Sequence, residues 1–153
     1  MENMVRVMAS GVFDILHMGH LHFLEEARKL GDELVVVVAT DNTARKRKHE
    51  PITPQDMRRN MIAALRVVDR AVVGTDGDMF DIVKQVKPDI IALGFDQDHD
   101  ETIIEQRLAK MGLEVKVVRL PQLDHDLNGT RKIMQKVIDW YLFQERIKKV
   151  EKK

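Results

Sequence analysis

Two histidines, His17 and His20, lie one helical turn apart near the start of the chain. At this spacing both imidazole rings point to the same side of a helix, where they can donate hydrogen bonds to oxyanions without the heavy hydration of a lysine. Gly19 stands between them and leaves room for a ligand at the helix start. Free N–H groups and a partial positive charge at a helix N-terminus suit phosphate, so these residues predict a phosphate site.

The flanking residues indicate how this histidine pair is held. Residues 5–9 form a short apolar run that predicts a strand, and residues 19–30 repeat apolar side chains at helical spacing. Gly11 between them permits a sharp exit from the strand or a close approach of backbone to a ligand. A histidine pair one turn apart is also half of many zinc sites. The chain has no cysteine, and its other histidines form no evident ligand cluster, so we disfavour zinc.

Residues 11–20 read Gly-Val-Phe-Asp-Ile-Leu-His-Met-Gly-His. This segment resembles the motif Gly-x-Phe-Asp-x-x-His-x-Gly-His of the HxGH nucleotidyltransferases in the cytidylyltransferase-like superfamily, and the resemblance extends from about residue 5 to about residue 138. It implies transfer of a nucleotidyl group from ATP or CTP to a phosphorylated acceptor, with release of pyrophosphate. By position, it assigns the two histidines to the triphosphate and to the charge that develops at the α-phosphate, and it places Val12, Phe13 and Asp14 against the nucleotide.

The order of predicted elements favours an α/β fold. Strands are expected at residues 5–9, 34–39, 71–74, 89–93 and 114–119, with helices at 19–30, 55–68, 78–86, 101–111 and from 128 or 129 onward. Alternating strands and helices predict a doubly wound, five-stranded parallel sheet with a C-terminal helix. The resemblance implies that this is a Rossmann-like fold of the HIGH nucleotidyltransferase type. Ligands bind such sheets beyond the carboxyl ends of the strands, at a topological switch point. The segment from Gly11 to His20 leaves the first strand there.

Composition limits the function classes. The 153 residues suit one domain, taken as residues 1–143, followed by a charged tail over 144–153 that frays or extends the last helix. The chain has 25 basic and 25 acidic residues, which argues against a general nucleic-acid or anionic-membrane binder. With no cysteine, no apolar run that could span a bilayer and no signal-peptide pattern, a cytoplasmic location is expected.

Residues 40–54 are polar and basic and are expected to form a loop after the second strand. Four consecutive basic residues occupy positions 45–48, and such a run is most often a solvated surface. The resemblance implies that a lysine of this loop clamps a phosphate, and Lys46 and Lys48 are both candidates. Further on, the resemblance implies a phosphate-binding arginine near the start of the next helix, and Arg58 aligns with it best.

Two further segments complete the predicted site. Gly94, Asp96 and Gln97 follow an apolar strand, where a Gly-x-Asp sequence can hold a ribose or a base edge. The Asp-Gln pair resembles archaeal FAD synthases, which join AMP to FMN, and Phe95 and Gln97 are candidates for contact with a base or a flavin. The second segment, residues 127–131, corresponds by position to a family motif that points a helix at the β- and γ-phosphates.

The second segment departs from the family motif in part. Thr130 matches the last hydroxyl of the motif, whereas Asn128 and Gly129 do not match it. Asparagine is a good N-cap and glycine exposes backbone N–H groups, so an anion site is still expected there. Arg131 would then reach the phosphates, with His17, His20 and Lys48 as the other catalytic candidates.

The resemblance thus implies an adenylyltransferase that moves AMP from ATP to FMN. Mg²⁺ is expected to bridge phosphate oxygens with few protein ligands, so no metal-binding residues are assigned. The alternatives are a CTP-dependent transferase acting on glycerol 3-phosphate or a related polyol phosphate, a sugar-phosphate adenylyltransferase, and a nucleotide-binding regulator without turnover. The resemblance also implies a homodimer, and Trp140, Tyr141 and Phe143 are expected to pack on the sheet or at a dimer contact.

Overall fold

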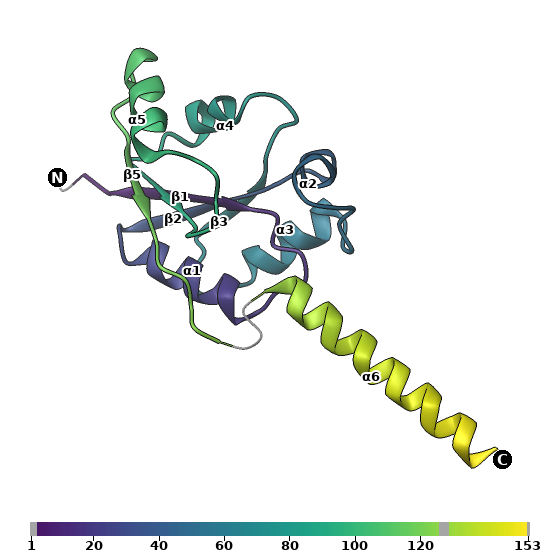
Figure 1. The fold of residues 1–153 in the computed structure, drawn as a ribbon. Helices are drawn as coiled ribbons and strands as arrows, with labels where there is room; N and C mark the ends of the chain where they lie inside the picture. The colour runs from purple at the N-terminus through teal and green to yellow at the C-terminus, as the bar shows by residue number, and fades with distance from the viewer. Residues whose placement is uncertain (1–2, 126–128, 153) are drawn as a thin grey trace.

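Short runs of β-branched and aliphatic residues form the central sheet. The computed structural model describes residues 3–125 and 129–152. Its strands are β1 (Arg6–Gly11), β2 (Glu33–Val38), β3 (Arg70–Val73), β4 (Ile90–Leu93) and β5 (Lys116–Arg119). All pair in parallel in the order β3-β2-β1-β4-β5, which confirms the doubly wound prediction and places the switch point between β1 and β4 (Figure 1).

Helices cover both faces of the sheet. They are α1 (Met18–Arg28), α2 (Asp41–Arg47), α3 (Gln55–Ala63), α4 (Met79–Val86), α5 (Glu101–Lys110) and α6 (Thr130–Glu151). Successive strand residues point to opposite faces, so Val7 of β1 packs in one apolar cluster with Leu24 and Ile62, from α1 and α3. Met8 packs in the other cluster, with residues of α4 and α5. Figure 1 shows the two pairs of helices on opposite sides of the sheet.

The region after β2 differs from the prediction. Residues 41–47, expected to be loop, form α2, whose N-cap Thr40 accepts a hydrogen bond from the backbone N–H of Thr43. The helix after it, predicted to reach residue 68, ends at Ala63. The chain turns early because Asp69 must pair with β2: its N–H donates to the Leu34 carbonyl at 3.0 Å, and its carboxylate accepts from the Leu34 N–H at 2.7 Å.

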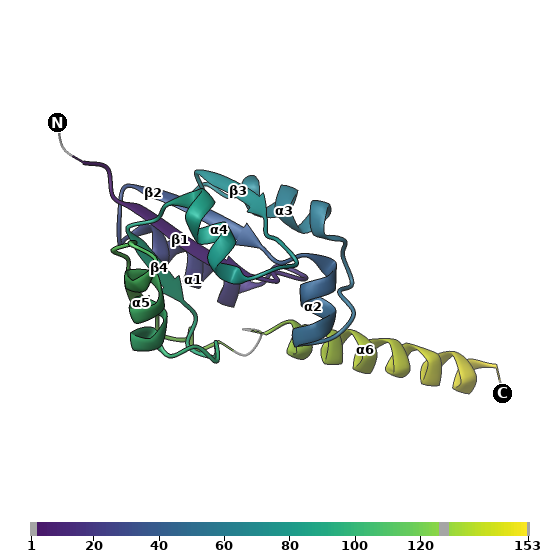
Figure 2. The ribbon, with the colours of Figure 1, turned by 90° about the horizontal axis from the view of Figure 1, so that it is seen from above.

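Helix α6 leaves the body of the fold. It extends away from the sheet in both Figure 1 and Figure 2, and none of its residues is buried. It continues to Glu151, so most of the predicted tail is helical. The expectation that Trp140, Tyr141 and Phe143 pack on the sheet is wrong, since their exposed fractions are 57 to 63%. Within residues 3–125 and 129–152, no helix combines the length and the apolar character needed to cross a bilayer.

Candidate active site

The β1–α1 loop turns sharply as it leaves the sheet. Phe13 and Ile15 have positive φ angles of 54° and 51°, a conformation that non-glycine residues seldom adopt. The Phe13 ring folds back over Gly11, where a Cβ atom would lie 2.9 Å from the ring. The buried ring also meets the His20 imidazole edge-on, with the centroids 5.3 Å apart. Gly11 therefore makes room for the ring that supports the second histidine.

The two histidines stack on each other at the start of α1. Their ring centroids are 3.7 Å apart, with 25° between the planes. Nδ1 of His17 accepts a hydrogen bond from the His20 N–H at 3.4 Å, so in the neutral ring Nε2 carries the proton. Nδ1 of His20 is buried and has no hydrogen-bond partner in the described part of the chain. Of the nitrogens described, the Nε2–H of His17 is therefore the group left for a ligand to engage.

Burial keeps both histidines neutral. It lowers the pKa of His20 to about 3, with further lowering by the nearby charges of His17 and Lys48. The pKa of His17 is lowered by burial and then by the charge of Lys48. At neutral pH each imidazole therefore carries one N–H and no net charge, and Lys48 supplies positive charge beside them.

The two candidate lysines act on different charged neighbours. Lys48 is the C-cap of α2, and its charge acts on both histidines. The charge of Lys46 acts instead on Asp76, whose pKa is lowered mainly by two side-chain hydrogen bonds and to a smaller extent by Lys46. Both lysines are exposed, and the charge of Lys48 lowers the pKa of both histidines.

Asp14 joins the β1–α1 loop to the segment before α3. Its buried carboxylate accepts hydrogen bonds from the N–H of Ile52 at 2.7 Å, the N–H of Thr53 at 3.0 Å and the hydroxyl of Thr53 at 2.7 Å. Burial raises the pKa of Asp14, but these hydrogen bonds and the charge of Arg58 outweigh it and leave the pKa below its usual value. The carboxylate is therefore ionised and occupied with holding the loop.

Arg58 does not reach outward to a phosphate as expected. Its side chain is 1% exposed. Nε donates to the Thr53 carbonyl at 2.9 Å, one terminal nitrogen donates to the Val12 and Ala39 carbonyls at 2.8 Å each, and the other contacts Asp41 at 2.7 Å. The phosphate-binding prediction for Arg58 is wrong, because its guanidinium is buried and committed to the loops that follow β1 and β2.

Gln97 also differs from its predicted role. Its Oε1 accepts from the Gly94 N–H at 3.0 Å, and its Nε2 donates to the Ser10 carbonyl of β1 at 3.1 Å. The amide thus holds the β4–α5 loop against β1 and does not point to a ligand. The side chains that project from this loop include Phe95, 48% exposed, and Asp96, which is also exposed.

The N-terminus of α6 meets the same β1–α1 loop. The Thr130 hydroxyl donates to the Asp14 carbonyl at 2.6 Å, and Gly129 is the N-cap in an extended conformation. Arg131 follows in the first turn and is exposed. The prediction for Asn128 lies outside the described residues. Two helix N-termini, those of α1 and α6, therefore converge on one loop, and each offers free N–H groups to an anion.

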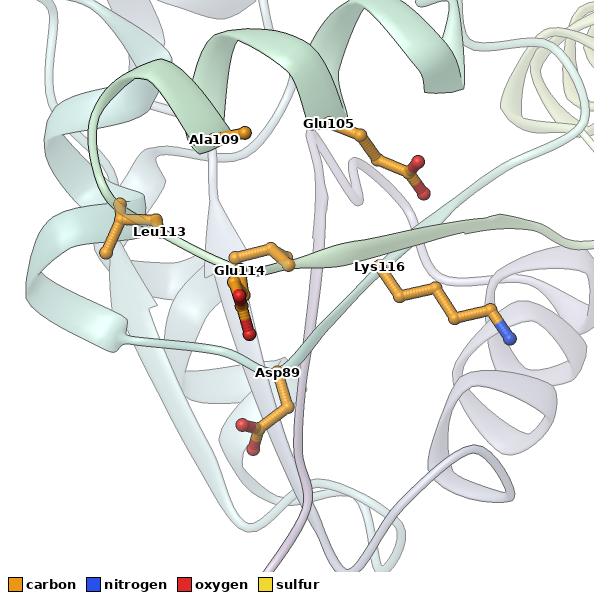
Figure 3. A pocket seen from close by; sticks show the side chains of 7 residues that line it. Asp89, Glu105, Ala109, Leu113, Glu114 and Lys116 are labelled. Atoms are coloured by element: carbon orange, nitrogen blue, oxygen red, sulfur yellow. The ribbon is translucent and has the colours of Figure 1, made fainter.

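A separate depression lies at the opposite end of the sheet. It is open to solvent, and Figure 3 shows it at the amino ends of β4 and β5, against α5. Its lining comprises Asp89, Glu105, Ala109, Leu113, Glu114, Val115 and Lys116. Ligands of parallel sheets bind at the carboxyl ends, and none of the predicted site residues lines this depression.

A comparison with protein families identifies the chain. The family model described as cytidylyltransferase-like matches residues 8–149, a span that includes both helix N-termini and the histidine pair. The chain belongs to the cytidylyltransferase-like family.

Named relatives and a solved structure are similar over most of their length. The FAD synthase of Aciduliprofundum boonei is 61% identical over 137 residues, which cover 89% of this chain and 92% of that protein. The FAD synthase of Thermoplasma volcanium is 51% identical over 136 residues, covering 89% and 96%. A crystal structure described as the lipopolysaccharide core biosynthesis protein from Thermoplasma volcanium GSS1 has a TM-score of 0.78 at 54% identity, over 80% of this chain and 100% of that one.

In this cytidylyltransferase-like chain, the structure brings together part of the predicted set. The β1–α1 loop with Gly11–His20, Lys48 at the end of α2 and the α6 start at Thr130 lie around one site. The charge of Lys46 acts on Asp76, and Arg58 and Gln97 bind backbone carbonyls. Sequence reasoning missed Arg119, which holds the β4–α5 loop from β5. A lone arginine at a strand end carries no local pattern that marks such a role.

Proposed function

We propose that this chain is an FAD synthase, which transfers AMP from ATP to the phosphate of FMN and releases pyrophosphate. FAD synthases from two archaea, at 61% and 51% identity over most of both chains, support this activity. The observation in the structure that carries it is the stacked, neutral histidine pair at the switch point, next to Lys48 and two helix N-termini.

The reaction is a substitution at the α-phosphorus of ATP. An oxygen of the FMN phosphate forms a new P–O bond there, while the bond to the bridging oxygen breaks and its electron pair leaves with pyrophosphate. An ionised phosphate needs no base, so positioning and charge stabilisation are the tasks of the protein. His17 and His20 donate N–H groups to the phosphates, Lys48 adds a positive charge, and the first turn of α6, with Arg131, holds the β- and γ-phosphates.

The two sides of the site suit different parts of the substrates. The side of α2 carries Lys48, whose positive charge fits the FMN phosphate. The side of β4 carries the exposed Phe95 ring and the Asp96 carboxylate, which fit a base and the hydroxyl groups of a ribose. We therefore assign the adenosine of ATP to the β4 side.

A divalent metal, which we take to be Mg²⁺, accompanies the triphosphate. The groups gathered at the site are imidazoles, an ammonium and backbone N–H groups, a set that suits phosphate oxygens better than a bare cation. Such an ion would neutralise charge on the leaving pyrophosphate. The imidazoles, Lys48 and the helix N–H groups would hold the phosphates that carry it.

A second candidate is a sugar-phosphate adenylyltransferase, because the similar Thermoplasma volcanium crystal structure is described as a lipopolysaccharide core biosynthesis protein. Incubating the protein with ATP or CTP, and with FMN, glycerol 3-phosphate or a sugar phosphate, separates these activities. We expect pyrophosphate and FAD only from ATP with FMN. Turnover with another pair and none with FMN would reject the FAD synthase assignment.

Variants of the histidines test the mechanism. We expect His17→Ala and His20→Ala each to lower turnover by about 10²- to 10³-fold, the usual effect of removing one charge-stabilising donor. Their melting temperatures are measured alongside, because the His17 ring caps α1 and the His20 ring packs on buried Phe13; we expect both variants to stay folded at the assay temperature. Turnover near the wild-type rate in both variants would contradict the mechanism.

We also propose that the protein works as a homodimer through α6. Its exposed large apolar side chains are Val137, Ile138, Trp140, Tyr141, Leu142, Phe143, Ile147 and Val150. Five of these recur every three or four residues along one side of the helix, the pattern of a helix that pairs with another. This stripe consists of Val137, Trp140, Phe143, Ile147 and Val150. The family model extends to residue 149, so most of α6 belongs to the common domain, and a second copy of the chain is the partner that is always present.

Sedimentation of the intact chain tests this proposal. We expect a dimer, and a monomer for Trp140→Glu, while Lys149→Glu, which changes charge outside the stripe, stays dimeric. A wild-type monomer at micromolar concentration would overturn the proposal. Binding of that monomer to lipid vesicles would assign the stripe to a membrane surface instead. The cytoplasmic location expected from the sequence stays a prediction.

A further inference from the structure

Arg119, the last residue of β5, gathers the backbone carbonyls of the loop that follows β4. One terminal nitrogen of its guanidinium donates to the carbonyls of Gly94 and Gln97 at 2.9 Å each and lies 3.4 Å from that of Phe95. The other terminal nitrogen donates to the His99 carbonyl. A single side chain thus contacts four carbonyl groups within residues 94–99.

The remaining nitrogen of Arg119 completes the arrangement. Nε donates to the Glu101 carboxylate at 2.5 Å, at the start of α5, and this ion pair is about one-third exposed. A guanidinium has five donors in a fixed plane, which lets it serve several acceptors at once. A lysine ammonium in the same place is a single point and cannot reach both ends of the loop. The chemistry of the contact is therefore specific to arginine.

The same loop is held from the other side by Gln97. Its amide links the Gly94 N–H to the Ser10 carbonyl of β1, with distances of 3.0 and 3.1 Å. The loop is thus attached to β5 by Arg119 and to β1 by Gln97, directly beside the switch point between β1 and β4. Phe95 and Asp96 project from this held backbone, and both are exposed.

We propose that Arg119 is a positioning residue for nucleotide selection. It fixes the loop of residues 94–99 so that Phe95 and Asp96 meet the base and ribose of ATP, and it touches neither the nucleotide nor the reacting atoms. This inference rests on the proposed function for the identity of the nucleotide. No sequence motif and no spacing of polar residues marks Arg119 as part of the nucleotide site.

Two variants of the intact chain test the role. Arg119→Lys loosens the loop from β5, and Gln97→Glu loosens it from β1. For each, we expect KM for ATP and the dissociation constant of ATP without FMN to rise by about tenfold, since a small misplacement of binding groups has effects of this order or larger. KM for FMN should stay within about twofold, and the preference for ATP over CTP should fall.

A matched control is Arg107→Lys on α5. Arg107 is exposed and pairs with Asp78 at 3.6 Å, away from the loop, so its variant should keep the wild-type constants. If Arg119→Lys only lowered the melting temperature, with KM for ATP and the ATP-over-CTP preference unchanged, the residue would be purely stabilising and the proposal overturned. If that variant failed to fold, an unchanged preference in Gln97→Glu would overturn it equally.

The nucleotide dissociation constants separate this inference from the proposed function. A wild-type chain that bound ATP more tightly than CTP but formed no FAD would refute the FAD synthase assignment, and the constants of Arg119→Lys would still decide the role of Arg119. A wild-type chain that bound ATP and CTP equally would refute nucleotide selection by this loop, whatever acceptor the enzyme used.

Discussion

Replacing Arg58 by methionine tests whether this arginine holds the fold or binds a substrate. The change keeps an aliphatic chain of similar length but leaves the carbonyls of Val12, Ala39 and Thr53 and the Asp41 carboxylate without their donor. Asp41 is partly exposed and can be solvated, but each buried acceptor left unpaired costs about 1–3 kcal/mol, so we expect a loss of about 3–5 kcal/mol. For a domain of this size, that loss lowers the melting temperature by about 10 °C.

The measurement is urea unfolding of the ligand-free protein, followed by far-ultraviolet circular dichroism. Fluorescence is unsuitable, because the single tryptophan, Trp140, lies exposed on α6 and does not report on the core. The matched control is Arg59→Met, the adjacent helix position, whose side chain makes one long hydrogen bond of 3.4 Å to the Ala71 carbonyl. We expect the control to lose less than about 1 kcal/mol.

The two roles of Arg58 give opposite results in the absence of ligand. A residue that holds the loops contributes its free energy before any substrate binds, whereas a phosphate-binding arginine contributes only afterwards. If Arg58→Met unfolded within about 1 kcal/mol of the wild type while the affinity for ATP collapsed, our reasoning would be refuted and the phosphate role restored.

Other predictions concern the charges around the site. Burial lowers the pKa of His20 from its ordinary 6.5 to about 3 in the folded chain. Between these two pH values the unfolded chain binds a proton on His20 that the folded chain does not, so the free energy of unfolding falls as the pH drops from 6.5 to about 3. His20→Asn should make urea unfolding less pH-dependent, by up to about 1.4 kcal/mol per pH unit. Lys48→Gln should lower kcat/KM by about tenfold or more, and Lys46→Gln by less than about threefold, in a steady-state assay of FAD formation. Asp14→Asn should cost about 2 kcal/mol in urea unfolding, since an amide cannot accept all three hydrogen bonds.

The sheet could be predicted from the sequence because its strands are buried on both faces. Residues 34–38 of β2 are all buried and read as an unbroken aliphatic run. Helix α2 could not be predicted in this way, since Ala44 is its only buried residue and no apolar stripe marks it. Gly31 after α1 fits the sequence pattern of a left-handed helix stop, but its role is close packing: a Cβ atom there would lie 2.7 Å from the Val5 carbonyl oxygen.

The geometry of the site follows from the sequence where short side chains act locally. The spacing of His17 and His20 fixes their stacking, whereas the Thr130 hydroxyl, matched by position to a phosphate-binding hydroxyl, donates to the Asp14 carbonyl 116 residues away. Long side chains are harder to place. Carbonyl groups that are distant in sequence decide where Arg58 and Gln97 point. Arg58 contacts the loop after β1 at a separation of 46 residues, and Gln97 contacts β1 at a separation of 87. Residue type and local spacing contain no information about such partners.

The buried Arg58 and the strand-end Arg119 share a purpose that follows from electrostatics. The carbonyl oxygens of loops at the carboxyl ends of strands carry partial negative charge, and oxygens left facing the site would repel a triphosphate. Arg58 takes up such carbonyls on the β2 side, and Arg119 takes them up on the β5 side. With those oxygens engaged, the loops present N–H groups, imidazoles and Lys48 to the ligand. Two guanidiniums that do not touch the phosphate thereby make the site favourable for it, so losing either one should weaken ATP binding although no direct contact to the nucleotide is removed.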